Sequence, residues 1–116
     1  MIREGIHYKI GKWLLNAETG LLEVDDPIKQ TSSLDHTPLR LLLCLIKYKN
    51  HDVSKDTMLQ EVWPNKVVSE DVLSVAISQI RKSLGDKARK PEFIKTIPSV
   101  GYRLIAPVSE VKHQEQ

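Results

Sequence analysis

The fold of this chain is decided by one segment, which reads SEDVLSVAISQIRKSLG over residues 69–85. Ser69 is a good helix N-cap, and the acidic residues after it suit the positive end of a helix dipole. Gly85 supplies the residue type that commonly ends a helix. Apolar residues recur at three- and four-residue steps, at Leu73, Ile77, Ile80 and Leu84. This period predicts an amphipathic helix over about 69–84 with one face in the core.

The opposite face of this helix carries short, polar and basic side chains. They are Asp71, Val75, Ser78, Gln79 and Lys82, with Arg81 at the flank. A helix with small outer residues can enter a DNA major groove, which is about 12 Å wide. There glutamine can bond an adenine edge, valine can touch a thymine methyl, and lysine or arginine can pair with phosphate or guanine. A solvated amphipathic helix that binds nothing has the same pattern. The neighbouring elements must therefore distinguish a DNA-reading helix from a solvated one.

Two further helices are predicted upstream. Apolar residues recur with the helical period from Asp35 to Ile46, which indicates a buried helix. Ser54 is predicted to cap a shorter helix over 55–63, and Pro64-Asn65 ends it. The short helix and the segment 69–84 then form a helix-turn-helix, in which the second helix reads DNA and the first braces it.

Strand patterns flank the helices. Before Asp35, short apolar pieces alternate with turn signals at 16–20 and 25–27, which predicts a small antiparallel sheet. After the last helix, the pattern strand-turn-strand over about 93–106 predicts a hairpin. A hairpin at this place can lay its tip in the adjacent minor groove, although an ordinary edge hairpin has the same pattern. Its candidate DNA contacts are Lys95, Thr96, Ser99 and Arg103. The predicted fold class is α+β: a winged helix-turn-helix with an N-terminal antiparallel sheet, three helices and a C-terminal hairpin wing.

Length and composition set the class of protein. The 116 residues fit one domain, expected over 1–107, while the polar stretch 108–116 is expected to be a flexible tail or the start of a linker. The longest apolar run, Leu41–Ile46, falls far short of the ~20 residues that cross a bilayer. The N-terminus lacks the features of a signal peptide, so a cytoplasmic location is expected. The single cysteine, Cys44, fits a structural role.

The distribution of charge is more informative than its sum. A net charge of +2 does not by itself indicate a polyanionic partner. Between Gln79 and Arg103, however, seven basic residues face only two acidic ones, and affinity for nucleic acid depends on the surface that touches it. The histidines lack metal-ligand spacing, and no phosphate-binding glycine loop or nucleophile elbow is present. We therefore expect no enzyme, no cofactor and no metal.

The order and spacing of these segments resemble the OmpR/PhoB-type winged-helix DNA-binding domain over roughly 8–108. The resemblance is carried by VSKDTMLQEVW at 53–63, VLSVAISQIRKSLGD at 72–86, IKTI at 94–97 and GYRL at 101–104. The stretches 86–91 and 96–98 are similar to the CadC/ToxR branch, whose members join this domain to a membrane segment. The resemblance implies a bacterial transcription regulator that binds double-stranded DNA, here as the cytoplasmic domain of an inner-membrane protein.

The resemblance also implies particular contacts. In the helix and wing, the matching DNA contacts are Val75, Ser78, Gln79, Arg81, Lys82, Thr96, Ser99 and Tyr102 or Arg103. Trp63 is implied to approach a phosphate, while its place on an apolar stripe fits a core tryptophan equally well. Asn65 and Lys66, in the loop after it, are implied to contact phosphate or RNA polymerase.

Two departures from the family change what is expected. Many response regulators carry arginine or histidine where this chain has Ala76 and Ser78, so fewer charged contacts are expected. The wing tip reads PSV at 98–100 where family members often carry an arginine, which disfavours deep minor-groove insertion. The family also implies two copies on a direct-repeat site. The alternative function is a winged-helix module that contacts RNA polymerase or another regulator without reading DNA.

Overall fold

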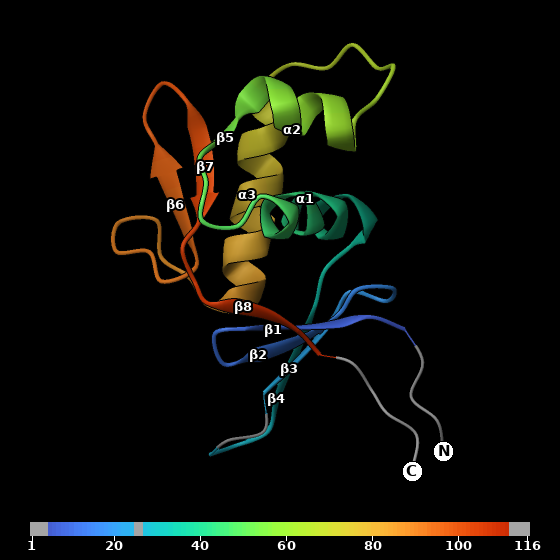
Figure 1. The fold of residues 1–116 in the computed structure, drawn as a ribbon, viewed down its shortest axis with the longest axis vertical. Coiled ribbons are helices and arrows are strands. Elements are labelled where there is room, and N and C mark those ends of the chain that lie inside the picture. The colour runs from blue at the N-terminus through green and yellow to red at the C-terminus, as the bar shows by residue number, and fades with distance from the viewer. Residues whose placement is uncertain (1–4, 25–26, 112–116) are drawn as a thin grey trace.

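The computed structural model describes residues 5–24 and 27–111 and consists of two antiparallel sheets around three helices (Figure 1). In chain order the elements are β1 (His7–Ile10), β2 (Trp13–Asn16), β3 (Leu21–Val24), β4 (Gln30–Ser33), α1 (His36–Lys47), β5 (Val53–Ser54), α2 (Lys55–Val62), α3 (Asp71–Leu84), β6 (Ile94–Ile97), β7 (Gly101–Leu104) and β8 (Val108–Val111). The predicted order of sheet, helices and terminal hairpin is confirmed.

The larger sheet has the strand order β4-β3-β2-β1-β8, so the chain returns to its first strand at the end of the domain. Residues 108–111, expected to belong to a tail, instead form β8, with Val108 opposite Ile10 and Val111 opposite His7. The sequence pattern missed this strand because an edge strand bonds through its backbone and needs no apolar alternation. The expected tail is corrected over 108–111, and residues 112–116 lie outside the described residues.

The smaller sheet has the order β5-β7-β6 and contains the wing hairpin. Thr96 lies opposite Tyr102, and Ile97 lies opposite Gly101. Gly101 is required by close packing, because a Cβ atom there would lie 2.0 Å from the carbonyl oxygen of Val53. The hairpin is thereby held directly against the residues that lead into α2.

The helix ends agree with the sequence except at the start of α3. Ser54 caps α2 as expected, accepting a hydrogen bond from the Thr57 backbone N–H. Gly85 ends α3 in the left-handed conformation with φ 71°. Ser69 is not the N-cap of α3: Glu70 occupies that place with helical φ and ψ, and Ser69 only accepts a backbone bond from Val72. Glu70 itself makes no side-chain cap bond, and its carbonyl accepts a backbone bond from Leu73.

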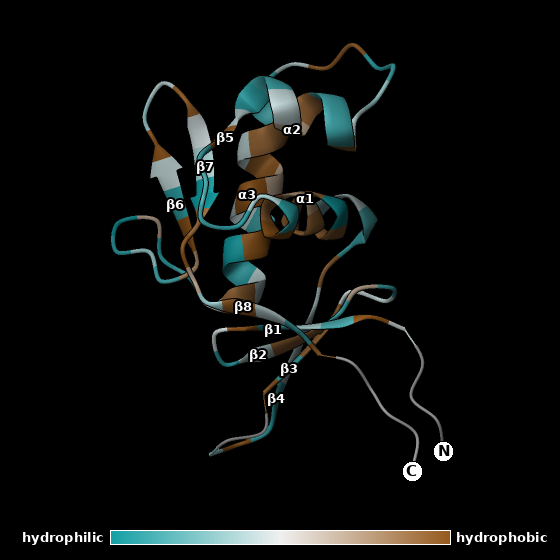
Figure 2. Ribbon diagram, in the orientation of Figure 1, coloured by the Kyte–Doolittle hydropathy of each residue, from teal (hydrophilic) through white to brown (hydrophobic). Residues whose placement is uncertain are grey.

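The core lies between the helices and the inner faces of both sheets. The four predicted core residues of α3 are each at most 1% exposed, and Figure 2 shows the apolar sides of the helices turned toward one another. The Trp13 indole N–H donates to the Leu84 carbonyl at 3.1 Å, and the Ser83 hydroxyl donates to the Ser33 carbonyl at 3.0 Å. These bonds fix the C-terminal end of α3 to the larger sheet. Within the described ranges, no helix has the length and apolar character that crossing a membrane requires.

Candidate nucleic-acid interface

The outer face of α3 is open and free of bulky side chains. Its exposed residues are Asp71, Ser74, Val75, Ser78, Gln79 and Lys82. Residues at 75, 78, 79 and 82 follow the three- and four-residue spacing of one helical stripe, and we call these four side chains the recognition face. Val75, at its N-terminal end, is 58% exposed. A shallow depression runs along the stripe between Ser74 and Lys82.

Trp63 lies beside the N-terminal half of α3. Its side chain is half-buried and packs against the core. It also lines, together with Thr37, Val72 and Gln79, a second depression that reaches the recognition face. The sequence left two roles open for this residue, and its position is compatible with both: the ring fills the core, and the same ring borders the surface beside the recognition face.

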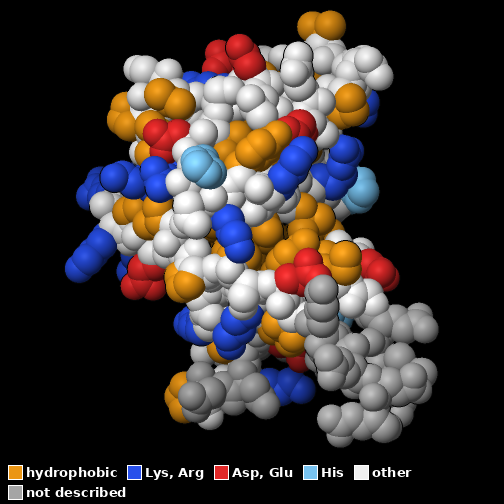
Figure 3. Space-filling view, in the orientation of Figure 1, with side chains coloured by type: hydrophobic (Ala, Val, Ile, Leu, Met, Phe, Trp, Pro, Cys, Tyr) orange, Lys and Arg blue, Asp and Glu red, His pale blue; other side chains and the backbone are white. Residues whose placement is uncertain are grey.

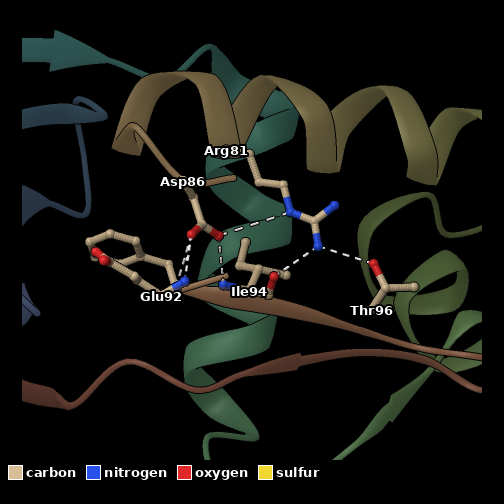
Figure 4. Close-up of polar contacts among 6 residues, drawn as sticks. Arg81, Asp86, Glu92, Ile94 and Thr96 are labelled. Atoms are coloured by element: carbon tan, nitrogen blue, oxygen red, sulfur yellow. Dashed lines mark hydrogen bonds and ion pairs between the residues drawn. The ribbon is translucent and has the colours of Figure 1, made fainter. Parts of the chain in front are cut away.

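Arg81 does not belong to the recognition face. Its side chain is only 13% exposed and turns toward the wing (Figure 4). The Nη2 atom donates to the Ile94 carbonyl at 2.8 Å and to the Thr96 hydroxyl at 3.0 Å. The Nε atom lies 3.9 Å from Oδ2 of Asp86, an ion-pair distance and too long for a hydrogen bond.

Asp86 has a fully buried side chain directly after the end of α3. Its Oδ1 atom accepts backbone N–H bonds from Glu92 at 2.7 Å and Phe93 at 3.2 Å, and its Oδ2 atom accepts from Ile94 at 2.9 Å. From the sequence, this residue was counted among the two acids of a basic segment and within the family-matching stretches 72–86 and 86–91, and no structural role was assigned to it. A carboxylate next to a helix-ending glycine, and shortly before a strand, was the signal that could have identified it.

Three of the predicted wing residues lie on its surface. Lys95, Thr96 and Ser99 are exposed, and Ser99 occupies the tip with φ 65°. The hydroxyl of Thr96 is the acceptor for Arg81, so this side chain is already held. Lys95 and Ser99 are therefore the wing side chains best placed to meet a DNA backbone.

The other two predicted wing residues are held by contacts within the protein. Tyr102 is buried, 8% exposed, within the core. Arg103 reaches back to the turn before β5, where its guanidinium donates to the Asn50 carbonyl and approaches Asp52 at 3.5 Å. These contacts hold the base of the wing and direct the arginine away from the tip.

Basic side chains gather around the wing. In Figure 3 lysine and arginine cluster at the left, where Figure 1 places the loop between α3 and β6. That loop carries Lys87, Arg89 and Lys90, all exposed. The local basic excess seen in the sequence thus forms a surface feature next to the candidate interface.

The loop between α2 and α3 is the second exposed feature near the recognition face. Lys66 and Val67 are exposed there, and Asn65 adopts φ 61°. The loop borders a depression whose other side is formed by Leu59 and Trp63. The side chain of Lys66 is thus available to a partner, and it lines the same depression as Trp63.

A polar cluster between α1 and α2 has a structural character. The Tyr48 hydroxyl and the Lys47 ammonium both donate to the Glu61 carboxylate. The bond from Tyr48 is the main reason that the pKa of Glu61 lies below its ordinary value. Burial raises the pKa of Cys44 to about 11, so this thiol stays protonated and unreactive. In the part of the chain that the structure describes, no three metal-binding side chains come together.

Three helices with a helix-turn-helix, followed by a two-stranded wing, define a winged-helix domain. Residues 29–104 match the family described as "Transcriptional regulatory protein, C terminal". The chain belongs to this family, and the resemblance inferred from its sequence is confirmed.

Relatives and solved structures agree with this membership. The transcriptional activator CadC of Escherichia coli is 27% identical over 108 residues, covering 92% of this chain and 20% of CadC. The cholera toxin transcriptional activator of Vibrio cholerae is 35% identical over 77 residues, covering 65% of this chain and 26% of that protein. The chain thus spans about a fifth to a quarter of the length of these relatives.

Two solved structures share the fold. The DNA-binding domain of E. coli CadC superposes with a TM-score of 0.78 at 25% identity, covering 92% of this chain and 98% of that one. The DNA-binding domain of Klebsiella pneumoniae RstA, solved in complex with the RstA box, has a TM-score of 0.70 at 22% identity, covering 84% and 95% of the two chains.

Proposed function

We propose that this chain is the sequence-specific, double-stranded-DNA-binding domain of a bacterial transcription regulator. Helix α3 lies in the major groove, and the β6–β7 wing lies on the adjacent minor groove or backbone. The observation that carries this proposal is the recognition face: an exposed stripe of small and polar side chains on the second helix of a helix-turn-helix. The names of the relatives, which are transcriptional activators, support it.

The side chains divide into two roles. Val75, Ser78 and Gln79 face the base edges, because they lie on the exposed stripe and carry no charge. Lys82 at the end of the stripe and Lys95 on the wing bind phosphates, which fix position without reading sequence. Ser99, an uncharged residue at the wing tip, adds a contact to the DNA backbone. The wing lacks an exposed arginine at that tip, so most specificity is expected from α3.

Selection of bound duplexes from a random library, followed by a salt titration of the best site, tests the proposal. A sequence reader enriches one motif, and its log Kd rises with log salt at about 0.9 per phosphate neutralised. An enriched direct repeat would support two copies bound in tandem. A library that returns no motif, with binding insensitive to salt, would overturn DNA reading.

The second candidate is a protein-contact module, favoured by the exposed loop that carries Lys66 and Val67. We propose that this loop contacts RNA polymerase while α3 holds DNA, so that both activities coexist in one domain. Changing Lys66 to Glu and Val67 to Ser then abolishes stimulated transcription in vitro and leaves DNA affinity unchanged. Equal stimulation by the variant would remove the loop from this role.

We also propose that the domain is the cytoplasmic part of a longer regulator anchored in the inner membrane. The likeness to CadC over 92% of the chain, and the greater length of the relatives, support this. Fractionation of cells that express the complete gene, with detection by an antibody to this domain, tests it. Recovery of the full-length protein only in the soluble fraction would exclude membrane anchoring.

A further inference from the structure

We propose that Arg81 is a positioning residue which, together with the buried carboxylate of Asp86, fixes the wing relative to the recognition helix. The pair then sets the spacing between the bases that α3 reads and the backbone that the wing contacts. This inference rests on the proposed DNA binding. It differs from the contact expected from the family resemblance, in which Arg81 touches DNA itself.

The geometry joins α3 to strand β6 at two points. Arg81 leaves the last turns of α3 and bonds the start of β6 at Ile94 and its interior at Thr96. Asp86 gathers the three backbone N–H groups of Glu92, Phe93 and Ile94. The two side chains meet at 3.9 Å (Figure 4). Side-chain bonds thus fix the last residues of the loop between α3 and β6, and they also hold strand β6 itself.

Arginine and aspartate are the residue types that this arrangement requires. A planar guanidinium can bond Ile94 and Thr96 on one side while facing a carboxylate on the other, and an ammonium group lacks that shape. A fully buried carboxylate needs several donors and a neighbouring cation, and Asp86 has three N–H groups and Arg81. Both side chains are therefore committed to the protein itself.

Two substitutions separate positioning from direct contact. A phosphate accepts lysine as a point charge, so Arg81→Lys keeps most of a direct contact but loses the paired bonds to β6. Asp86 is fully buried and cannot touch DNA, so Asp86→Asn matters only if positioning matters. Arg89→Lys, an exposed arginine in the same loop, is the matched control.

The experiment measures affinity and hydroxyl-radical footprints on the selected site. We expect Arg81→Lys and Asp86→Asn each to lose about tenfold in affinity, the worth of one charge-assisted contact between the wing and a phosphate that is no longer aligned. Their footprints should keep the protection of the sugar backbone beside α3 and lose the protection beneath the wing, while Arg89→Lys behaves as the unaltered chain. If Asp86→Asn binds within twofold of the unaltered chain with the full footprint, positioning is refuted. Near-normal binding by Arg81→Lys refutes it as well.

A measurement without DNA keeps this inference distinct from the proposed function. Amide hydrogen exchange of residues 94–104 in the free protein should quicken in Arg81→Lys, with exchange in the centre of α3 unchanged. Thr96→Val, which removes the hydroxyl that accepts from Arg81, is the substitute if Asp86→Asn fails to fold, and it should quicken the same amides. Unchanged exchange in Arg81→Lys overturns the inference even when DNA binding is confirmed. Failure of the unaltered chain to select DNA overturns the proposed function, and the exchange measurement then still shows by itself whether Arg81 holds the wing.

Discussion

At the residue scale, Gln79 and Lys82 lie one turn apart on the recognition face and have different chemistry. We expect Gln79→Ala to relax preference at one base pair, costing about 1–3 kcal/mol on the selected site and little on random DNA. Lys82→Ala should weaken binding to all duplexes alike and reduce the salt slope by about one. Titrations of both variants with selected and scrambled duplexes, at several salt concentrations, measure the affinities and the salt slopes. Equal losses on the two duplexes for both variants would contradict the assignment of the helix face.

Val75 is the apolar side chain at the N-terminal end of the same stripe. Apolar contact with a thymine methyl is the direct readout open to valine. Replacing thymines of the selected site one at a time by deoxyuridine should therefore weaken binding at one position, by about 1 kcal/mol for the lost methyl group. Val75→Ala should be insensitive to that replacement. A thymine effect that persists in Val75→Ala would assign the contact to another side chain.

At the scale of elements, Glu61 joins α2 to α1 through Tyr48 and Lys47. Its pKa is lowered in the folded state, mainly by the bond from Tyr48. The folded state therefore gains stability from Glu61 above the ordinary carboxylate pKa, roughly 4.3, and loses it as the pH falls through the lowered value. Glu61→Gln should be less stable than the unaltered chain at pH 7 and lose less stability below pH ~4. Urea unfolding at several pH values shows whether the difference in free energy of unfolding between the two chains becomes smaller as the pH falls.

Strand β8 is the element whose contribution is simplest to remove. A chain that ends at Pro107 loses the pairing of Val108–Val111 with β1 and exposes the edge of that strand. We expect its free energy of unfolding to fall by about 1–3 kcal/mol, measured by thermal or urea unfolding. A chain that ends at Val111 is the control and should match the longer chain. Equal stability of both truncated chains would show that β8 adds nothing to the fold.

The sequence predicted elements with strong periodicity and missed those held by backbone or long-range side-chain contacts. The core face of α3 and the cap at Ser54 were predicted correctly because they depend on local spacing and local bonds. Strand β8 has no apolar pattern, and its partner is far away in the chain. Arg81 was placed at the flank of the outer face, and its turn toward β6 depends on tertiary contacts that no helical projection contains.

At the scale of the whole molecule, α3 is the element that both sheets hold. The wing is bonded to it through Arg81, and the larger sheet is bonded to it through Trp13 and Ser83. Trp13→Phe keeps a smaller aromatic ring and removes the indole donor, leaving the Leu84 carbonyl without this partner. We expect it to lower stability by about 1–2 kcal/mol and to leave DNA affinity unchanged. Stability equal to that of the unaltered chain would show that water replaces the indole.

The pairing of β8 with β1 has a mechanical consequence. Tension applied to the chain beyond Val111 enters the domain through this one strand pair, in which Val111 lies opposite His7. A pull along β8 loads its hydrogen bonds together, whereas a pull across the sheet breaks them one after another from the Val111 end. The force needed to detach β8 from β1 while the domain is bound to DNA therefore depends on the direction of the pull.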